Sequence, residues 1–228
     1  MNILALIVSK KNSKRLKGKN RLLIKKKTLV ERTYDFAKKI NFIKKIAIST
    51  DDSFFLNLKF KGKIIKIKRP KNLSTHKSKS YKVVIHALKE VEKYNKFNGV
   101  LLLQPTSPFR SYKNLKKGYS LFKKYKGTHS VVSVAETKNS NKKYFIVKNK
   151  KINKLNPNIK TKKLNRKFQV DGNFYIVTNN FLKKNKKFIK EGKTFVIIQK
   201  SKKLSLDIDT KKDYNLAKNL IKSWWIKR

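Results

Sequence analysis

The chain has 228 residues, of which 62 are Lys or Arg and 12 are Asp or Glu, so its formal net charge is +50. This length suits one domain with a sizeable core, and 39% hydrophobic residues exclude a disordered polycation. The lack of cysteine excludes disulfide scaffolds and cysteine nucleophiles, and no apolar run approaches the roughly 20 residues that span a bilayer.

Apolar runs alternate with segments of helical periodicity over the first 134 residues. In chain order, the patterns predict a strand at 3–8, a basic loop at 9–21, a helix at 29–40, strands at 46–48 and 64–67, a helix at 83–94, a strand at 100–103, a helix at 112–125 and a strand at 130–134. This alternation predicts right-handed βαβ units and a mostly parallel sheet. Ligands of such sheets bind beyond the carboxyl ends of the strands.

The pattern breaks after residue 137. Lys and Asn dominate up to residue 167, with a short hairpin-like segment at 144–152, which indicates an arm inserted at about 138–168 in a single domain spanning 1–228. Strand character returns at 174–177 and 195–198, an extended segment follows at 205–210, and a helix at 213–225 closes the chain.

The basic loop after the first strand is the first candidate for a binding site. Residues 10–20 contain six cationic side chains, and a cation-rich loop between a strand and a helix suits a triphosphate. The loop lacks the spacing of a Walker A motif. A solvated basic loop in a lysine-saturated chain remains the alternative.

The second candidate is the pair Asp207 and Asp209. Two carboxylates two residues apart on an extended segment point the same way and can share Mg²⁺, which takes one or two carboxylates plus substrate phosphates. The alternative is that the pair caps the last helix, with Asp209 or Thr210 as the cap.

Two further polar segments follow predicted strands. Residues 104–110, beginning with Gln104, form a rigid loop with two prolines, or an ordinary proline turn. Residues 49–52 end the second strand, where Asp52 is favoured as a helix cap. The three histidines lack metal-ligand spacing, and His86 is favoured as a packed residue.

The basic charge has two interpretations. Lys and Arg are spread evenly, and only seven are Arg, whereas specific phosphate and base recognition favours Arg. A biased codon usage therefore explains the charge better than a polyanion partner, and no specific nucleic acid is expected. Residues 224–226, next to cations, could contact a membrane surface, although core packing of the last helix is favoured.

Taken in order, these segments resemble the acylneuraminate cytidylyltransferases, also called CMP-sialic acid synthetases. The resemblance rests on motifs that span nearly the whole chain: Ser13-Lys14 with Gly18-Lys19-Asn20, Ser49 to Asp52, Arg69-Pro70, Ser80 with Val83 to Leu88, Leu103 to Arg110, Ser130 to Val134, Gly172 to Ile176, and Asp207 to Thr210. It implies a three-layer α/β/α nucleotidyltransferase-type, Rossmann-like fold that couples CTP to a nonulosonic, nine-carbon sugar acid and releases pyrophosphate.

The resemblance also implies roles for individual residues. The catalytic set is Lys19, Asp209 and Lys10; the nucleotide-binding set is Ser13, Lys14, Asn20, Arg69 and Ser80; the sugar-binding set is Gln104, Tyr175 and Arg166; and Asp207 with Asp209 would bind Mg²⁺. It further suggests a homodimer that uses the arm. A cytoplasmic location is expected on other grounds, because residues 1–8 are apolar but make a poor signal peptide, with no positive charges before them and Lys10-Lys11 after them. The alternative is a weakened transferase that binds polyanions.

The chain departs from the family pattern at several positions. Lys10, Lys11 and Asn12 stand in place of Arg-Gly-Gly, so the guanidinium fork is lost and two side chains replace glycines. Asp171 stands where Asn is usual before Gly172. These departures are consistent with a weakened enzyme or an unusual sugar substrate.

Overall fold

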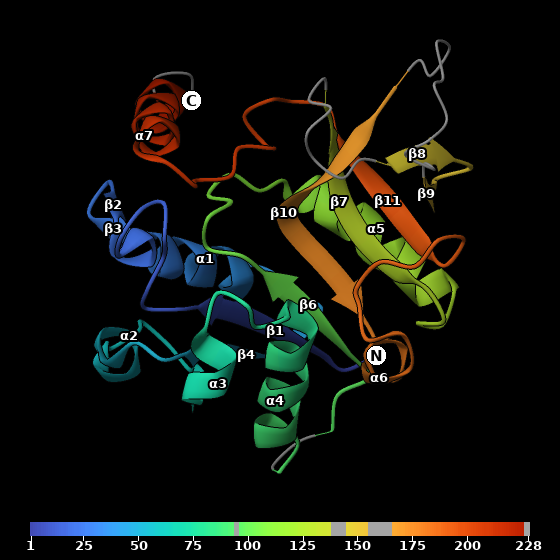
Figure 1. Cartoon of the computed structure of the whole chain (residues 1–228), viewed down its shortest axis with the longest axis horizontal. Helices are drawn as coiled ribbons and strands as arrows, with labels where there is room; N and C mark the ends of the chain where they lie inside the picture. The colour runs from blue at the N-terminus through green and yellow to red at the C-terminus, as the bar shows by residue number, and fades with distance from the viewer. Residues whose placement is uncertain (94–95, 138–144, 155–165, 226–228) are drawn as a thin grey trace.

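A nine-stranded sheet forms the centre of the computed structural model, which describes residues 1–93, 96–137, 145–154 and 166–225 (Figure 1). The strand order is β5-β4-β1-β6-β10-β7-β11-β9-β8. The strands are β1 (Ile3–Ser9), β4 (Ile43–Thr50), β5 (Ile65–Lys68), β6 (Gly99–Leu103), β7 (Ser130–Glu136), β8 (Phe145–Lys148), β9 (Lys151–Lys154), β10 (Phe168–Val177) and β11 (Thr194–Gln199), while β2 (Leu23–Ile24) and β3 (Lys27–Thr28) form a separate hairpin.

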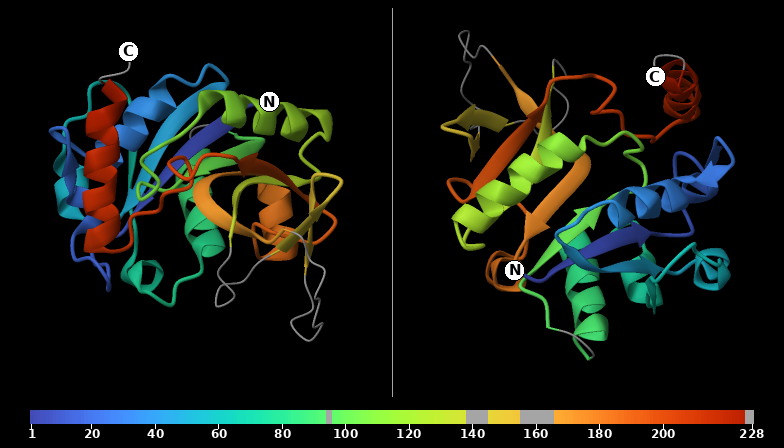
Figure 2. Two further views of the ribbon diagram at one scale, coloured as in Figure 1. Left: turned by 90° about the horizontal axis from the view of Figure 1, so that it is seen from above. Right: turned by 180° about the vertical axis from the view of Figure 1, so that it is seen from behind.

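Helices cover both faces of the sheet, as the α/β/α prediction requires (Figure 2). Alternate residues of β1 face opposite sides: Ile3, Ala5 and Ile7 pack against α1 and α5, whereas Leu4 and Leu6 pack against α4 and α6. The helices are α1 (Leu29–Lys38), α2 (Ser53–Asn57), α3 (Lys71–Ser74), α4 (Ser80–Glu92), α5 (Tyr112–Lys124), α6 (Asn179–Asn185) and α7 (Lys211–Trp225), with a 3₁₀ turn at Lys19–Arg21.

The sheet is mostly parallel, with one antiparallel strand in its middle. β1 pairs in parallel with β4 and β6, and β7 pairs in parallel with β11, but β10 runs antiparallel between β6 and β7. The carboxyl ends of the parallel strands therefore share one edge, as predicted. Because β10 runs the opposite way, its first residues, not its last, lie at that edge.

The predicted arm is partly described. The hairpin signal is confirmed, because β8 and β9 pair with each other from Phe145↔Lys154 to Lys148↔Lys151. This hairpin is joined to the main sheet, where β9 pairs with β11 and β8 with β10. Residues 138–144 and 155–165 of the predicted arm lie outside the described residues.

Local capping explains where several helices begin. Thr28 caps α1 in a capping box with Glu31, and Asp52 accepts a hydrogen bond from the Phe54 amide at the start of α2, which confirms Asp52 as a helix cap. The short elements β2, β3, α3 and α6 were not predicted, since each is too brief for a periodic signal.

Among the described residues, no helix is both long and apolar enough to cross a membrane. The side chains at the end of α7, including Trp224 and Trp225, lie outside the described residues, so the predicted alternatives of surface contact and core packing stay predictions. Farther back on α7, Tyr214 and Ala217 pack with the β2–β3 hairpin, and the Tyr214 hydroxyl donates to the Leu23 carbonyl at 2.7 Å.

Candidate active site

The basic loop after β1 is tied to the end of β4 by two neighbouring carboxylates. The Lys11 amide donates to Asp51 Oδ1 at 2.9 Å, and Arg21 Nε donates to Asp52 Oδ2 at 2.9 Å. The hydrogen bond from Arg21 holds the pKa of Asp52 below its usual value. The Asn20 side-chain amide donates to the Lys10 carbonyl at 3.1 Å and closes the loop on itself. The loop is therefore held in place at the edge formed by the carboxyl ends of the parallel strands, which is called the ligand edge below because ligands of such sheets bind there.

Lys11 and Asn12, which stand where the family has two glycines, do not need a left-handed backbone conformation. Among the described residues, the non-glycine residues with positive φ do not include Lys11 or Asn12. Gly18 does have a positive φ of 61° where the 3₁₀ turn begins. Replacing the two glycines therefore causes no backbone strain in this conformation. The effect of the two side chains on activity stays a prediction.

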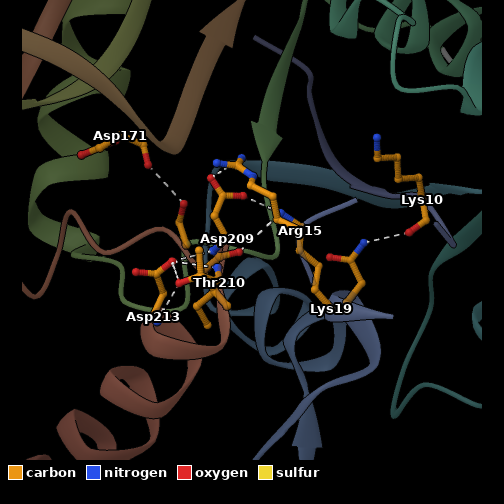
Figure 3. Close-up of polar contacts among 10 residues, drawn as sticks. Lys10, Arg15, Lys19, Asp171, Asp209, Thr210 and Asp213 are labelled. Carbon is orange, nitrogen blue, oxygen red and sulfur yellow. Dashed lines mark hydrogen bonds and ion pairs between the residues drawn. The ribbon is translucent and has the colours of Figure 1, made fainter. Parts of the chain in front are cut away.

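Asp207 and Asp209 lie between β11 and α7, directly opposite this loop. The residue between them, Ile208, is fully buried, and its amide donates to the Thr106 carbonyl at 2.8 Å. Asp209 is thereby presented to the loop, where Lys19 Nζ lies 2.9 Å from Oδ1 and Arg15 Nη2 lies 2.6 Å from Oδ2 (Figure 3). Residues about 190 positions apart in the chain meet here.

The start of α7 is capped by residues other than the aspartate pair. The Thr210 hydroxyl accepts from the Asp213 amide at 3.2 Å, and the Asp213 carboxylate accepts from the Thr210 amide at 2.8 Å (Figure 3). This reciprocal arrangement is a capping box. Thr210 is thus the cap, as one alternative foresaw, and the Asp209 carboxylate does not cap the helix.

The aspartate pair suits a hard cation such as Mg²⁺. Asp207 Oδ1 is buried without a hydrogen-bond partner, although the Thr106 side chain bonds to the carboxylate. Burial, and then the charge of Asp209, raises the pKa of Asp207. Mg²⁺ commonly takes one or two carboxylates and completes its shell with phosphates and water, so the two carboxylates are residues that could hold this ion.

The predicted phosphate-binding residues lie around Lys19. Lys10 is half-buried, and its pKa is lowered first by burial and then by the charges of Lys19 and Arg69. The Ser13 hydroxyl is buried without a partner, while Lys14 is exposed. Lys10, Lys14, Lys19 and Arg69 lie close enough for their charges to interact, and Asp51 and Asp209 offset only part of this charge, so the loop keeps a local excess of positive charge that suits an anionic ligand.

Arg69 and Ser80, both predicted to contact cytidine, differ in exposure. Arg69 is 7% exposed, and its guanidinium donates to Ser49 Oγ at 3.2 Å and to the Ser49 carbonyl. Burial lowers the pKa of Arg69 to about 10, so the group keeps its charge at neutral pH. Ser80 is exposed at the first residue of α4, on the ligand edge. Arg69 therefore supports the end of β4, whereas Ser80 is open to a ligand.

The Gln104 loop is shaped by a buried arginine. Arg110 donates to the carbonyl of Asn173 at 3.2 Å, to Thr33 Oγ1 at 3.4 Å and to the carbonyl of Gln104. Burial lowers the pKa of Arg110 to about 9. Sequence reasoning included Arg110 in a motif without giving it a role. Its contacts show that it joins the end of β6 to the first part of β10.

Gly172 lies against the Gln104 side chain. It has a φ of 77°, and a Cβ on it would meet Gln104 Oε1 and lie 3.2 Å from Ser107 Oγ. Glycine is required here both by the left-handed backbone and by this close approach. Gln104 itself is half-buried, so it remains available to a ligand at the ligand edge.

Asp171, next to this glycine, is a buried carboxylic acid without a cationic partner. It is 5% exposed; Oδ1 accepts from the Ser133 hydroxyl and, at 3.0 Å, from the Asn173 amide, whereas Oδ2 is buried without a partner. Burial raises the pKa of Asp171 from 3.8 to about 6. Sequence reasoning noted the departure from Asn at this position but not its energetic consequence.

We expect Asp171→Asn to make stability less dependent on pH. Between pH 4 and 6 the Asp171 carboxyl has lost its proton in the unfolded chain but keeps it in the folded chain. The free energy of unfolding of the wild type therefore falls as the pH rises through the folded pKa. The Asn variant should gain up to about 3 kcal/mol over wild type at pH 8 and much less at pH 4.5. Thermal unfolding at both pH values measures the difference. Asp35→Asn, at an exposed site, is the control, and an equal shift at both pH values would contradict this assignment.

The two remaining predicted sugar-binding residues are already engaged within the chain. Tyr175 is half-buried and packs on Phe188, with ring centroids 5.2 Å apart, and burial raises its pKa. Arg166 is exposed, and its Nη2 lies 3.0 Å from Glu136 Oε2. Glu136 and Arg166 flank the arm at the ends of β7 and β10, so a ligand would have to compete for this ion pair.

Comparison with known proteins agrees with this geometry. A family model described as cytidylyltransferase matches residues 4–223. The N-acylneuraminate cytidylyltransferase of Escherichia coli is 30% identical over 135 residues, which are 59% of this chain and 32% of that protein. The CMP-N,N'-diacetyllegionaminic acid synthase of Legionella pneumophila is 34% identical over 125 residues, 54% of each chain. The matched segments thus span about a third and about half of these relatives.

Solved structures show the same fold at low sequence identity. A CMP:2-keto-3-deoxy-manno-octonic acid synthetase, solved as a complex with CTP, superposes with a TM-score of 0.76 at 14% identity, covering 98% of this chain and 99% of that one. A cytidylyltransferase from Leptospira borgpetersenii gives a TM-score of 0.64 at 18% identity, with 98% and 87% coverage. With the family match over nearly all of its length and the shared fold, the chain belongs to the cytidylyltransferase family.

Proposed function

We propose that the protein transfers the cytidylyl group of CTP to a sugar acid of the nonulosonic class and releases pyrophosphate. The observation that carries this proposal is the meeting of Lys19 with Asp209 at 2.9 Å, which joins the basic loop to the aspartate pair at the ligand edge. A cation-rich loop facing carboxylates that can hold a metal is the arrangement that nucleotidyl transfer from a triphosphate needs.

In the proposed reaction, the cationic residues around this contact bind the phosphates and the polar residues bind the cytidine. Lys10, Lys19 and the nearby Lys14 neutralise the triphosphate, so that an anomeric hydroxyl can approach the α-phosphorus in line while the bond to the β-phosphate breaks. Asn20 and Ser80 would contact the cytidine, and Arg69 supports that side by holding the end of β4. Positioning and charge neutralisation are the main demands of such transfers.

Asp207 and Asp209 would hold Mg²⁺, since their oxygens are hard donors and Asp207 Oδ1 lacks a partner. The bound ion would neutralise phosphate charge as the pyrophosphate leaves. The Thr106 side chain, which bonds to the Asp207 carboxylate, would keep that carboxylate oriented for the ion.

On the sugar side, Gln104 and the Gly172 turn offer hydrogen-bonding groups, and the proposed set also includes Tyr175, on β10, and Arg166, which would have to leave its ion pair with Glu136. The curated relatives named for N-acylneuraminate and for diacetyllegionaminic acid support a nine-carbon sugar acid. We include in the proposal a homodimer formed through the arm and a cytoplasmic location, where CTP is supplied.

The test is pyrophosphate release from CTP and Mg²⁺ with sialic, legionaminic, pseudaminic and 2-keto-3-deoxy-manno-octonic acids offered singly. One sugar acid should give release that depends on both CTP and the sugar. Silence across the whole panel would count against the proposal. If the protein instead bound nucleic acid tightly, with log K falling by about 0.9 per neutralised phosphate as log salt rises, the polyanion alternative would gain support.

A further inference from the structure

A second concave surface lies away from the candidate active site, where α5, β11 and the β8–β9 hairpin are neighbours (Figure 1). It is a groove of about 1140 Å³ along the outer edge of β11. The hairpin turn at Asn149 and Lys150 lines one wall, and exposed residues of α5 line the other. None of the lining residues belongs to the catalytic, nucleotide-binding, sugar-binding or metal sets.

The strand at the bottom of this groove has an open edge. β7 pairs with β11 along the whole strand, whereas β9 pairs with its other side only at Phe195. The Val196 amide points to that outer side, where it donates to the Lys150 carbonyl at 2.9 Å. Because the direction of backbone groups alternates along a strand, the amide and carbonyl of Ile198 point the same way. Among the described strands, none pairs with this part of the edge.

Partly exposed apolar side chains flank the open edge on both sides. Ile198 lies on the hairpin side with Val147, and Ile197 lies on the α5 side with Leu121. Side chains of an added strand would alternate between these two sides. Backbone hydrogen bonds and alternating side-chain contacts are how sheets bind extended peptides at their edges.

Positive charge surrounds the apolar floor of the groove. The exposed lysines that line it are Lys113, Lys116, Lys117, Lys124, Lys150 and Lys200. None of the described lining residues is Asp or Glu, and none of these six lysines takes part in an ion pair within the described part of the chain. Like charges three or four residues apart on α5 repel each other, and an acidic ligand would relieve that repulsion.

We propose that this groove binds an extended, acidic segment of a partner protein, which adds to β11 as a further strand. Its apolar side chains would pack toward Val147 and Ile198, and its acidic side chains would face the lysines of α5. A lipid surface offers no strand to the open backbone groups, and a nucleic acid would leave the apolar floor uncovered. A second copy of the chain would bring another net charge of +50 to a positive rim. The inference does not depend on the proposed function.

The probe is a capped, fluorescent peptide of about seven residues in which glutamate and valine alternate. Two further versions are N-methylated, one at every valine and the other at every glutamate, so that each keeps one intact hydrogen-bonding edge. One version should bind like the unmodified peptide, and the other should bind about tenfold more weakly, because it can no longer pair with β11. Fluorescence anisotropy at about 0.15 M salt, where loose charge attraction is screened, measures the binding.

Lys117→Glu tests the charge of the rim. It should weaken binding of the unmodified peptide by about fivefold to tenfold. Lys45→Glu makes the same charge change on β4, in the other half of the sheet, and should stay within about twofold of wild type. Binding should also slow hydrogen–deuterium exchange of backbone amides in residues 195–204. Circular dichroism confirms that both variants are folded.

A difference between the two methylated peptides, together with weaker binding in Lys117→Glu alone, supports the proposal. Absence of binding to wild type at about 1 mM peptide would overturn it. So would equal binding of the two methylated peptides or equal weakening by both substitutions, since either result indicates attraction to the charge of the whole chain. If sedimentation showed a wild-type dimer that Lys117→Glu alone dissociates, the groove would belong to a second copy and the proposal would be wrong.

Discussion

Asp209→Asn is expected to slow cytidylyl transfer by roughly 10²–10³-fold while leaving the fold intact. The substitution keeps the shape of the side chain but removes the charge that would hold Mg²⁺ opposite Lys19. The free energy of unfolding should fall by about 1–2 kcal/mol, because the largely buried Lys19, whose side chain is 17% exposed, loses its carboxylate partner. Steady-state release of pyrophosphate, with the sugar acid that the panel identifies, measures the rate.

Asp35→Asn provides the matched control for this prediction. It also removes one negative charge, but from an exposed pair with Lys27 away from the ligand edge. Its turnover should equal that of wild type. If the turnover of Asp209→Asn were within about threefold of wild type, the Asp209 carboxylate would not contribute to stabilising the transition state.

Arg110→Met should lower the free energy of unfolding by about 1–3 kcal/mol, because the buried acceptors that Arg110 serves are left without a donor. The guanidinium is buried and serves the carbonyls of Gln104 and Asn173 and the hydroxyl of Thr33. Methionine fills similar space but donates no hydrogen bond, so these buried acceptors lose their partner. Urea denaturation followed by circular dichroism measures the loss.

Arg166→Met is the comparison for stability. Arg166 is an exposed arginine whose ion pair with Glu136 should contribute less than about 1 kcal/mol. If Arg110→Met proved as stable as Arg166→Met, the buried hydrogen bonds of Arg110 at the end of β6 would not contribute measurably to the free energy of unfolding. Because Arg110 touches no proposed ligand directly, partial loss of activity in folded Arg110→Met would report a displaced Gln104 loop.

Much of the fold could be predicted because the strands of a parallel sheet are buried on both faces. β1 and β6 are continuous apolar runs for that reason, and α1, α4 and α5 carry clear helical stripes. The reversed direction of β10 could not be predicted. Its apolar part at 174–177 looks the same as a parallel strand, and the direction of β10 depends on the connection through the arm, where periodicity is absent.

The ligand edge could also be located from the sequence, but the contacts within it could not. Asp209 stood out because acids are scarce in this chain, and Asp52 was recognisable as a cap because Asp is a favoured capping residue and it directly follows the second strand. Arg15 gave no such signal, since one cation among 62 looks like background until its partner is seen. The pKa of Asp171 depends on burial, which no local pattern reports.

The antiparallel course of β10 has a consequence for how this enzyme could change its substrate. β7 ends at Glu136 and β10 begins opposite it, with Phe168 paired to Glu136, so both ends of the intervening segment leave the sheet at the ligand edge. Residues inserted or deleted between them, outside the β8–β9 hairpin that pairs with β10 and β11, leave the register of the other strands unchanged. The proposed sugar side can therefore vary in this segment while the strands that carry the basic loop and the aspartate pair keep their pairing.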